Sequence, residues 1–343
     1  MNTNATIDSN HPSPPALEYR ITFDARRCVG CGLCAAFCPV DVIEMQPGQT
    51  ADARLEPQAT RPQLCWGCET CAGQCPHNAI KVTVYGGRDR FEGRAVAQPL
   101  DSVELARYQN WARTLKDILG LRWEPVAITL IAAGQPLPDV PMPEERLRYC
   151  QSLMAARRGR SLLMPANRHA CPDGTSILGL TPMPAKLASG ELYLLFHKLD
   201  NLTAAQRMVG ERPCLPPRTI DATLVTPLAK AALTPQVIAV VAQPEQAMWL
   251  LMSSSYYSGH RHELNASGYN AQCVETTLLP YVNKCLNVSF GCYGCRASSD
   301  VSDDLMFVGI PLGEMETVIA GLRELNKKAI QQSRAKIYLP PMA

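Results

Sequence analysis

The stretch CVGCGLCAAFCP at residues 28–39 has the same cysteine spacing as CWGCETCAGQCP at residues 65–76. Both stretches read C-x2-C-x2-C-x3-C-P, and a shift of 37 residues maps each cysteine of the first onto one of the second. The eight cysteines are Cys28, Cys31, Cys34, Cys38, Cys65, Cys68, Cys71 and Cys75. A fixed shift of this kind indicates an internal duplication.

The spacing suits a metal–sulfur cluster. Three cysteines at two-residue intervals wrap a loop around one face of a cubane and supply thiolates to three of its irons, so the fourth iron needs a ligand from elsewhere. Pairs of C-x2-C also make zinc ribbons. Two identical runs that each end in Cys-Pro favour two [4Fe–4S] clusters over zinc, and an electron-carrying role over a purely structural one.

Over about 65 residues this pattern resembles the bacterial-type ferredoxins, in which the fourth cysteine of each run serves the other cluster. The resemblance implies that one cluster is held by Cys28, Cys31, Cys34 and Cys75. It implies that the other is held by Cys65, Cys68, Cys71 and Cys38. Glycines in both loops let backbone N–H groups approach the sulfurs, which tunes the reduction potential.

The whole chain is too long for one ferredoxin. Its 343 residues suit two or three compact units. Hydrophobic residues make up 46 % and charged residues 19 %, which supports a proper core. The formal charge is only +2, with acids and bases mixed, so the sequence lacks the basic face of a nucleic-acid-binding protein.

The sequence also lacks membrane and export signals. No segment reaches the roughly 20 apolar residues of a membrane span. Residues 1–15 are polar and rich in proline, without the basic start and apolar stretch of a secretory signal. We therefore expect a cytoplasmic protein. In that compartment fifteen cysteines indicate metal ligation or redox chemistry rather than disulfides.

The predicted fold class is α+β, with a ferredoxin-like 2[4Fe–4S] module followed by a larger mixed α/β domain. We expect a disordered leader at 1–17, the ferredoxin domain at 18–85, a linker at 86–100 and the second domain at 101–335. In that domain, hydrophobic periodicity and charge pattern predict a helix that is capped by Asp101, Ser102 or both and runs to about Leu119, as well as helices at 144–158, 271–282 and 312–331 and one that starts at Pro244. Short apolar runs predict strands at 125–132, 237–242, 286–290 and 305–310.

Seven cysteines remain in the second domain: Cys150, Cys171, Cys214, Cys273, Cys285, Cys292 and Cys295. Cys292 and Cys295 form a C-x2-C knuckle between glycines after an apolar strand. Such a knuckle can ligate a cluster or metal, act as a redox dithiol, or have no chemistry.

The other five cysteines divide by their settings. Cys171 lies in a Pro-Asp-Gly turn and Cys273 at a predicted helix start. We therefore expect these two to complete a metal centre with Cys292 and Cys295, with Cys150 as the reserve ligand. Burial as a small hydrophobe suits Cys214 and Cys285, and it is the alternative role for Cys150.

A second resemblance covers most of residues 101–330. Several pieces in combination are similar to the family called domain of unknown function 169: Arg148-Tyr149-Cys150, Cys171-x2-Gly174-x3-Leu178-Gly179-Leu180, Ser189-Gly190-Glu191-Leu192-Tyr193, Pro244-Glu245-Gln246-Ala247-Met248, Cys273-x-Glu275 and Gly291-Cys292-x2-Cys295-Arg296. The resemblance itself implies no activity. The fusion to a ferredoxin implies that the second domain consumes electrons or holds a redox centre of its own.

Three functions fit these features. The first is an iron–sulfur oxidoreductase, in which electrons from an external donor reach a cysteine-bound redox centre, a third cluster or another metal, and reduce a small molecule. The second is an electron-transfer subunit that docks a partner enzyme. The third is a protein that handles or senses a redox cofactor. The expected partners are an electron donor or acceptor protein and a small-molecule substrate, with no nucleic acid and no membrane span.

Reduction of a small molecule also needs a proton donor near the substrate. Glu275 is the first candidate because it lies two residues from Cys273. Glu245 is the second because it opens a helix after a buried strand. Electrostatic support of the helix N-terminus is the alternative role for Glu245.

Overall fold

The computed structural model describes residues 18–48, 54–65, 67–85, 95–270 and 272–336. Two compact units divide the chain, Met1–Arg94 and Ala95–Ala343. The predicted leader lies outside the described residues, as does the predicted linker up to residue 94. Val96 forms a parallel bridge with Leu137, so the described end of that linker packs on the second unit.

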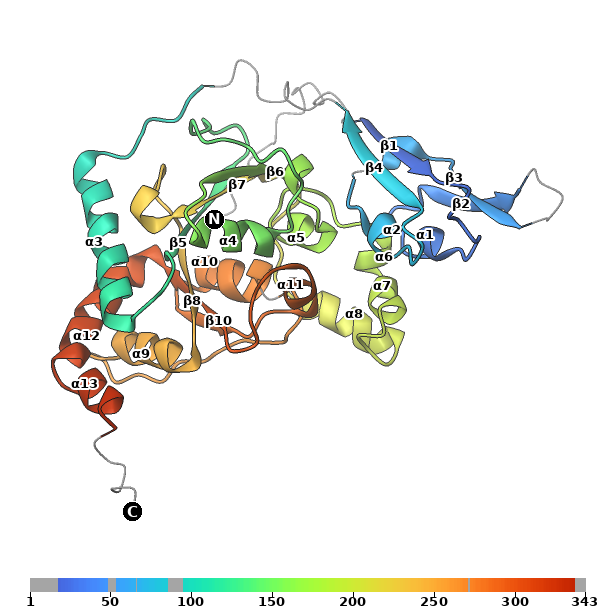
Figure 1. Cartoon of the computed structure of the whole chain (residues 1–343). Coiled ribbons are helices and arrows are strands. Elements are labelled where there is room, and N and C mark those ends of the chain that lie inside the picture. The colour runs from blue at the N-terminus through green and yellow to red at the C-terminus, as the bar shows by residue number, and fades with distance from the viewer. Residues whose placement is uncertain (1–17, 49–53, 66, 86–94, 271, 337–343) are drawn as a thin grey trace, which may run out of the picture. The chain divides into compact units, whose positions relative to one another are not determined.

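The described residues of the N-terminal unit form two small antiparallel sheets and two short α-helices (Figure 1). Its elements are β1 Glu18–Phe23, α1 Leu33–Ala36, β2 Ile43–Pro47, β3 Leu55–Ala59, the 3-10 helix η1 Pro62–Leu64, α2 Thr70–Gly73 and β4 Ile80–Tyr85. β1 pairs with β4, and β2 pairs with β3. Each sheet thus joins one strand from each half of the duplication, which locks the halves together.

The duplication extends to backbone detail. Helices α1 and α2 are both four residues long and start 37 residues apart. The left-handed residue before α1 is Gly32, and its counterpart before α2 is Glu69. Asp41 and Asn78 repeat the same relation with φ values of 51° and 49°. Both halves therefore fold around their cysteine loops in the same way.

The second unit is built on a six-stranded sheet of order β6-β7-β5-β8-β10-β9. The strands are β5 Val126–Ala132, β6 Leu162–Pro165, β7 Ile220–Pro227, β8 Val237–Ala242, β9 Asn287–Ser289 and β10 Met306–Pro311. All neighbouring strands run antiparallel. The α+β class is confirmed.

Helices and 3-10 turns connect these strands (Figure 1). The α-helices are α3 Ser102–Leu119, α4 Tyr149–Arg157, α5 Pro172–Ile177, α6 Ala185–Ala188, α7 Glu191–Leu195, α8 Leu202–Glu211, α9 Pro244–Ser254, α10 Leu279–Asn283, α11 Tyr293–Ser298, α12 Met315–Lys327 and α13 Ala329–Arg334. The 3-10 helices are η3 Ala166–Arg168, η4 Leu228–Lys230 and η6 Leu312–Glu314, and η5 Gln272–Leu278 is a π-helix.

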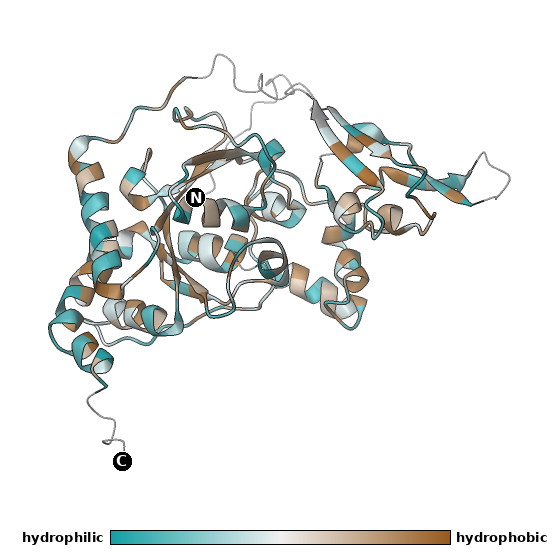
Figure 2. Cartoon of the chain, in the orientation of Figure 1, coloured by the Kyte–Doolittle hydropathy of each residue, from teal (hydrophilic) through white to brown (hydrophobic). Residues whose placement is uncertain are grey.

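The central strands are hydrophobic (Figure 2), and the sheet contributes buried residues to a core on each face. Ile238 and Val240 of β8 belong to a core shared with α3, α9 and α12. Val237 and Ala239 point the other way, into a core shared with α4 and the π-helix η5. Period-two alternation along one strand thus separates the two cores.

Three predicted helices need correction. The helix expected at 312–331 is a 3-10 turn at Leu312–Glu314 followed by α12 and α13, with a break at Lys328. The helix expected at 144–158 begins only at Tyr149, because Leu147 is extended and pairs with His169 through a parallel bridge. The helix expected at 271–282 is a π-helix as far as Leu278 and α-helical beyond it. The strands β6 and β7 had not been predicted. Among the described residues, no helix has the length and apolar character needed to cross a membrane.

Candidate redox sites

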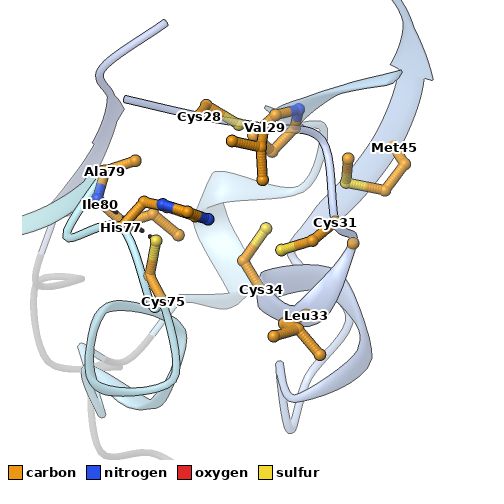
Figure 3. Close-up of a pocket in the computed structure, with 12 residues that line it drawn as sticks. Cys28, Val29, Cys31, Leu33, Cys34, Met45, Cys75, His77, Ala79 and Ile80 are labelled. Carbon is orange, nitrogen blue, oxygen red and sulfur yellow. Dashed lines mark hydrogen bonds between the residues drawn. The ribbon is translucent and has the colours of Figure 1, made fainter. Parts of the chain in front are cut away.

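The first cysteine set surrounds a cavity in the N-terminal unit. Cys28, Cys31, Cys34 and Cys75 line it together, with Val29, Leu33, Met45 and Ile80 among its apolar walls. Figure 3 shows the sulfurs of Cys31, Cys34 and Cys75 directed into the space between them. Cys75 comes from the second run, so the fold brings one cysteine across to the other half.

The second set combines three cysteines of the second run with one cysteine of the first. Burial first, and then the nearby Cys68, Cys38 and Cys65, raise the pKa of Cys71 to about 12. Cys38 comes from the first run and is therefore a neighbour of the second. For Cys34, burial is again the largest cause and raises the pKa to about 11, with Cys28 and Cys31 adding to it.

Backbone N–H groups point at the sulfurs in both halves. Val42 N donates to Cys38 Sγ at 3.2 Å, and Ala79 N donates to Cys75 Sγ at 3.3 Å. These two bonds are related by the same 37-residue shift. Hydrogen bonds of this kind stabilise negative charge on sulfur, which is how proteins tune cluster potentials.

Close backbone approach explains one glycine of the first loop. Gly30 has φ +73°, and a Cβ at this position would lie 2.5 Å from the carbonyl oxygen of Leu55. Any side chain there would push β3 away from the cysteine loop. The Gly at this position therefore serves the packing of the loop on the sheet.

In the second unit, Cys171 and Cys273 both lie close to Gly174. A Cβ on Gly174 would stand 3.2 Å from Cys273 Sγ and 3.7 Å from Cys171 Cβ. Cys171 is the N-cap of α5, and Cys273 lies in the π-helix η5, a type of helix found often at functional sites. Two cysteines that are about a hundred positions apart in the sequence thus lie close to the same glycine.

The knuckle cysteines extend this group. Cys292 is the N-cap of α11, and its Sγ accepts a hydrogen bond from Cys295 N at 3.4 Å. Burial is the main cause that raises the pKa of Cys171 to about 11, and Cys292 contributes. Burial, Cys171 and Cys292 together raise the pKa of Cys273 well above its usual range. Cys171, Cys273 and Cys292 are therefore electrostatic neighbours.

Cys150 joins the group from α4. Its side chain is hydrogen-bonded to that of Cys295, and this bond, followed by burial, raises its pKa. Cys171 and Cys292 also act on Cys150. The same hydrogen bond lowers the pKa of Cys295. We call these five residues the C-terminal cysteine array: Cys150, Cys171, Cys273, Cys292 and Cys295.

The two cysteines outside the array do not match the expectation. Cys214 and Cys285 were expected to be buried, but both are exposed. Cys214 follows the C-terminal end of α8, and Cys285 lies in the turn between α10 and β9. Neither position faces a core, so their exposure follows from their place in connecting segments.

A buried polar network joins the two loops that carry Cys171 and Cys273. Arg212 Nη1 donates to Asp173 Oδ1 at 3.1 Å and to Asn270 Oδ1 at 2.8 Å. Tyr193 Oη donates to Asp173 Oδ1 at 2.8 Å and lies 2.6 Å from Arg212 Nη1. The side chain of Arg212 is 5 % exposed and that of Asp173 is 15 % exposed. The network ties the Cys171 turn to the start of the π-helix.

This network was missed from the sequence. Asp173 lies two residues after Cys171, and Asn270 three residues before Cys273, which is the one local signal that could have pointed to them. Arg212 carries no such signal. It reaches both loops only because α8 ends beside them.

Neither predicted proton donor contacts an array cysteine through a hydrogen bond of the described structure. Glu275 Oε1 accepts from Ser267 N at 2.6 Å and Gly268 N at 3.1 Å, whereas its Oε2 is buried without a partner. Glu245 is exposed in the first turn of α9 and accepts from Ser333 Oγ at 3.3 Å. Glu275 orders the turn before the π-helix, and Glu245 links α9 to α13.

Both groups of cysteines share one property. Among the residues that the structure describes, no three His, Cys, Asp or Glu side chains stand ready to hold a single metal ion. The absence of a preorganised metal site among the described residues is common to the ferredoxin cysteines and the array. It therefore does not tell which of the two groups binds a metal. The type of ligand atom does indicate which metals could bind. Closely grouped, largely buried sulfurs suit iron–sulfur clusters or zinc and not hard cations.

Comparison with known families divides the chain as the fold does. Residues 27–79 match the "4Fe-4S dicluster domain" family, and residues 114–321, more than half of the chain, match DUF169, described as "Uncharacterised ArCR". The N-terminal unit is thus a ferredoxin-like iron–sulfur domain for electron transfer. Its clusters are of the 4Fe–4S type.

Individual relatives agree. An uncharacterized protein of Methanocaldococcus jannaschii, MJ0308, is 24 % identical over 219 residues, which are 63 % of this chain and 94 % of that protein. NADH-quinone oxidoreductase subunit I of Sodalis glossinidius is 42 % identical over 53 residues, 14 % of this chain and 29 % of that subunit. Ferredoxin-2 of Desulfomicrobium norvegicum is 42 % identical over 33 residues, 10 % of this chain and 56 % of that ferredoxin. The last two are matched over only part of their length.

Proposed function

This chain belongs to the DUF169 family, and from that premise we propose that it passes electrons between an external protein and a cysteine-bound redox centre in its DUF169 domain. The centre would serve to reduce a small molecule. In the ferredoxin domain, the proposed ligands of one cluster are Cys28, Cys31, Cys34 and Cys75. Those of the other cluster are Cys65, Cys68, Cys71 and Cys38.

The observation that carries the proposal is the convergence of the array. Its cysteines come from α4, the start of α5, the π-helix η5 and α11, four segments that are widely separated in the chain. Cysteines used only as small hydrophobes have no reason to gather in this way. In a chain that also carries an electron-transfer domain, such a gathering favours a redox centre.

The residues present fit such a centre. We propose Cys292, Cys295, Cys171 and Cys273 as its ligands. Burial makes the thiols of Cys171 and Cys273 resist ionisation, but a bound cation supplies the positive charge that thiolates need. When bound, an iron–sulfur cluster would supply a one-electron acceptor. The protein's own part is to exclude water from these sulfurs and hold them at fixed separation through the Arg212 network.

A reductase of this kind also needs a proton at the substrate. The structure adds Tyr193 to the candidates, because its hydroxyl bonds to Asp173 and Arg212 beside the Cys171 loop. Glu275 stays a candidate through its unpartnered Oε2, and Glu245 is the weaker choice because it is exposed. In Glu275→Gln, loss of turnover with intact internal electron transfer would support a proton-donating role, and unchanged turnover would remove Glu275 from the mechanism.

Metal analysis tests the centre. The full chain, purified without oxygen, should contain about twelve irons if the array holds a third four-iron cluster, against about eight without it. Acid-labile sulfide, zinc and flavin are measured on the same sample. Cys273→Ser should lower the iron content by about four, and Cys285→Ser is the matched control because Cys285 is exposed and outside the array. About eight irons in the wild type would refute a third cluster, and zinc in the array would make it structural.

A second function is favoured by one comparison. Fifty-three residues of the chain are similar to a subunit of NADH-quinone oxidoreductase, which is one part of a larger enzyme. On this view the chain is a ferredoxin-type subunit and its DUF169 domain docks a partner enzyme. Pull-down from its native host under reducing, anaerobic conditions distinguishes the two, because a subunit should copurify with stoichiometric partners.

A further inference from the structure

The array has five cysteines, one more than a four-ligand centre needs, and we infer that Cys150 and Cys295 form a thiol–disulfide couple. The couple would exchange two electrons with the ferredoxin clusters. This inference rests on the proposed function for its electron source alone, because it needs no metal in the array.

The two thiols already touch. Cys150 of α4 and Cys295 of α11 are hydrogen-bonded to each other through their side chains. Cys150 is 8 % exposed and Cys295 1 % exposed, and both pack in one hydrophobic cluster with Met154, Val241 and Phe307. A disulfide needs its two Cβ atoms within about 4.5 Å, so thiols in contact require little movement to join.

The neighbouring backbone holds this pair in place. Gln151 follows Cys150 on α4, and its Nε2 donates to the carbonyl oxygen of Ser298 on α11 at 2.6 Å. Arg158, just after α4, forms an ion pair with Asp300, just after α11. These two links tie α4 to α11 on the C-terminal side of the sulfur contact, so the pairing belongs to the fold.

The knuckle itself offers a different pairing that the structure does not favour. In a C-x2-C dithiol, Cys295 would join Cys292. Here the Cys292 sulfur turns to the N-terminus of α11, where it accepts from Cys295 N, while the Cys295 thiol faces Cys150. The geometry therefore predicts a link between two helices instead of one within the knuckle.

The electron count matches the ferredoxin domain. Reduction breaks the S–S bond, takes up two electrons and two protons, and yields two thiols. Each reduced [4Fe–4S] cluster gives one electron, so two clusters supply the pair. Ser299 Oγ lies 3.5 Å from Cys295 Sγ and is partly exposed, which offers one proton a path from water.

Burial limits the chemistry further. Attack by the thiol of another protein requires access to a sulfur, and neither sulfur of this pair offers it. The couple therefore reacts with electrons from the clusters or with a small oxidant. While it is oxidised, Cys295 cannot ligate a metal, so only Cys171, Cys273 and Cys292 stay available. The couple would thus decide whether the centre has its fourth ligand.

Peptide mapping of the anaerobically purified full chain tests the pairing. The protein is treated with diamide, a two-electron thiol oxidant, then alkylated, digested and analysed by mass spectrometry. We expect a peptide that links Cys150 to Cys295 in the wild type and in the Cys285→Ser control, and its loss in Cys150→Ser and Cys150→Ala. A Cys292–Cys295 link, or no link in the wild type, overturns the inference without reference to any variant's folding.

A stepwise reductive titration of the oxidised wild type tests the electron exchange. The first two electrons should restore two free thiols, and the paramagnetic signal of the reduced ferredoxin clusters should appear only afterwards. A signal from the first electron, with no gain in thiols, contradicts the exchange. Iron content separates this result from the proposed function: about eight irons with the link formed removes only the metal centre, and about twelve irons with no link removes only the couple.

Discussion

The two groups of cysteines in this protein are assembled in opposite ways. In the ferredoxin domain, each run supplies three sulfurs from one tight loop, and only the fourth comes from the other half. In the DUF169 domain, the array draws on four segments of the chain, and a buried ion pair holds two of them together. The first group is defined by local spacing and the second by the tertiary fold.

This difference predicts different sensitivities. A ferredoxin loop positions its sulfurs through nearby glycines and backbone N–H groups, so it depends little on distant residues. The array depends on how α4, α5, α11 and the π-helix pack, so changes that touch no cysteine should still disturb it. The following variants test this contrast, from the largest expected effect to the smallest.

Removal of the crossing cysteine should have the largest effect. In Cys38→Ser we expect loss of the cluster held by Cys65, Cys68 and Cys71, because the fourth iron loses its thiolate. Iron should fall by about four per chain, and the paramagnetic signal of one cluster should vanish. Cys75→Ser is the reciprocal variant and should remove the other cluster. If Cys38→Ser instead abolished the cluster of Cys28, the crossed ligation would be wrong.

Breaking the buried ion pair comes next. Arg212→Met leaves Asp173 buried without its cation, which should cost about 3–5 kcal/mol in the unfolding free energy of the C-terminal unit. The Cys171 turn should also separate from the π-helix, so array thiols should react faster with alkylating agents while the ferredoxin signals stay unchanged. Denaturant titration and timed alkylation measure both effects.

The control for this variant lies on the same helix. Arg207 forms an exposed ion pair with Glu211, so Arg207→Met should hardly change the unfolding free energy. Equal losses in the two variants would show that the Arg212 network does not hold the array together.

A glycine behind the π-helix gives a smaller effect. A Cβ in Gly309→Ala would lie 2.1 Å from the carbonyl oxygen of Thr276 and 2.8 Å from Pro280, so the π-helix must shift away from β10. We expect a cost of about 3 kcal/mol and altered reactivity of Cys273. Gly313→Ala has nothing within 4 Å of its new Cβ and should be nearly neutral. A stable Gly309→Ala with native Cys273 reactivity would argue against a fixed π-helix.

The smallest effect on stability is expected for a substitution at Gly174, which lies close to Cys171 and Cys273. Gly174→Ala places a methyl group 3.2 Å from Cys273 Sγ, which costs about 1 kcal/mol in packing, while the helical position gains a similar amount. Stability should therefore hardly change. The spectrum of a third centre should shift, with the ferredoxin signals as internal reference. Gly210→Ala, which meets nothing within 4 Å, is the control, and an unshifted spectrum in Gly174→Ala would place the centre elsewhere.

The same contrast explains what the sequence could predict. The 4Fe–4S type followed from cysteine spacing, because a cluster loop is encoded within a dozen residues, whereas DUF169 membership followed from a resemblance in several short pieces. Helix α3 begins at Ser102 with the side chain of Asp101 as its cap, and β8 has the predicted bounds, because capping and strand-length apolar runs are local signals. The late start of α4 was missed because it depends on a bridge between Leu147 and His169.

The array could be predicted only in part from the sequence. Glycine-rich turns singled out Cys171, Cys273 and the knuckle, but the contact of Cys150 with Cys295 depends on how α4 packs on α11. The partnership of Arg212 with Asp173 and Asn270 spans 39 and 58 residues, and no local pattern encodes it. Antiparallel pairing of β7 between β5 and β6 is equally non-local.

Anomalous diffraction from anaerobically grown crystals of the full chain tests the central claim most directly, because it locates each metal and identifies it. Data collected on both sides of the iron absorption edge should show iron at the two ferredoxin sites and a third iron site among Cys171, Cys273 and Cys292. Iron at the two ferredoxin sites alone, or a peak in the array that appears only at the zinc edge, would contradict a third iron–sulfur centre in the DUF169 domain.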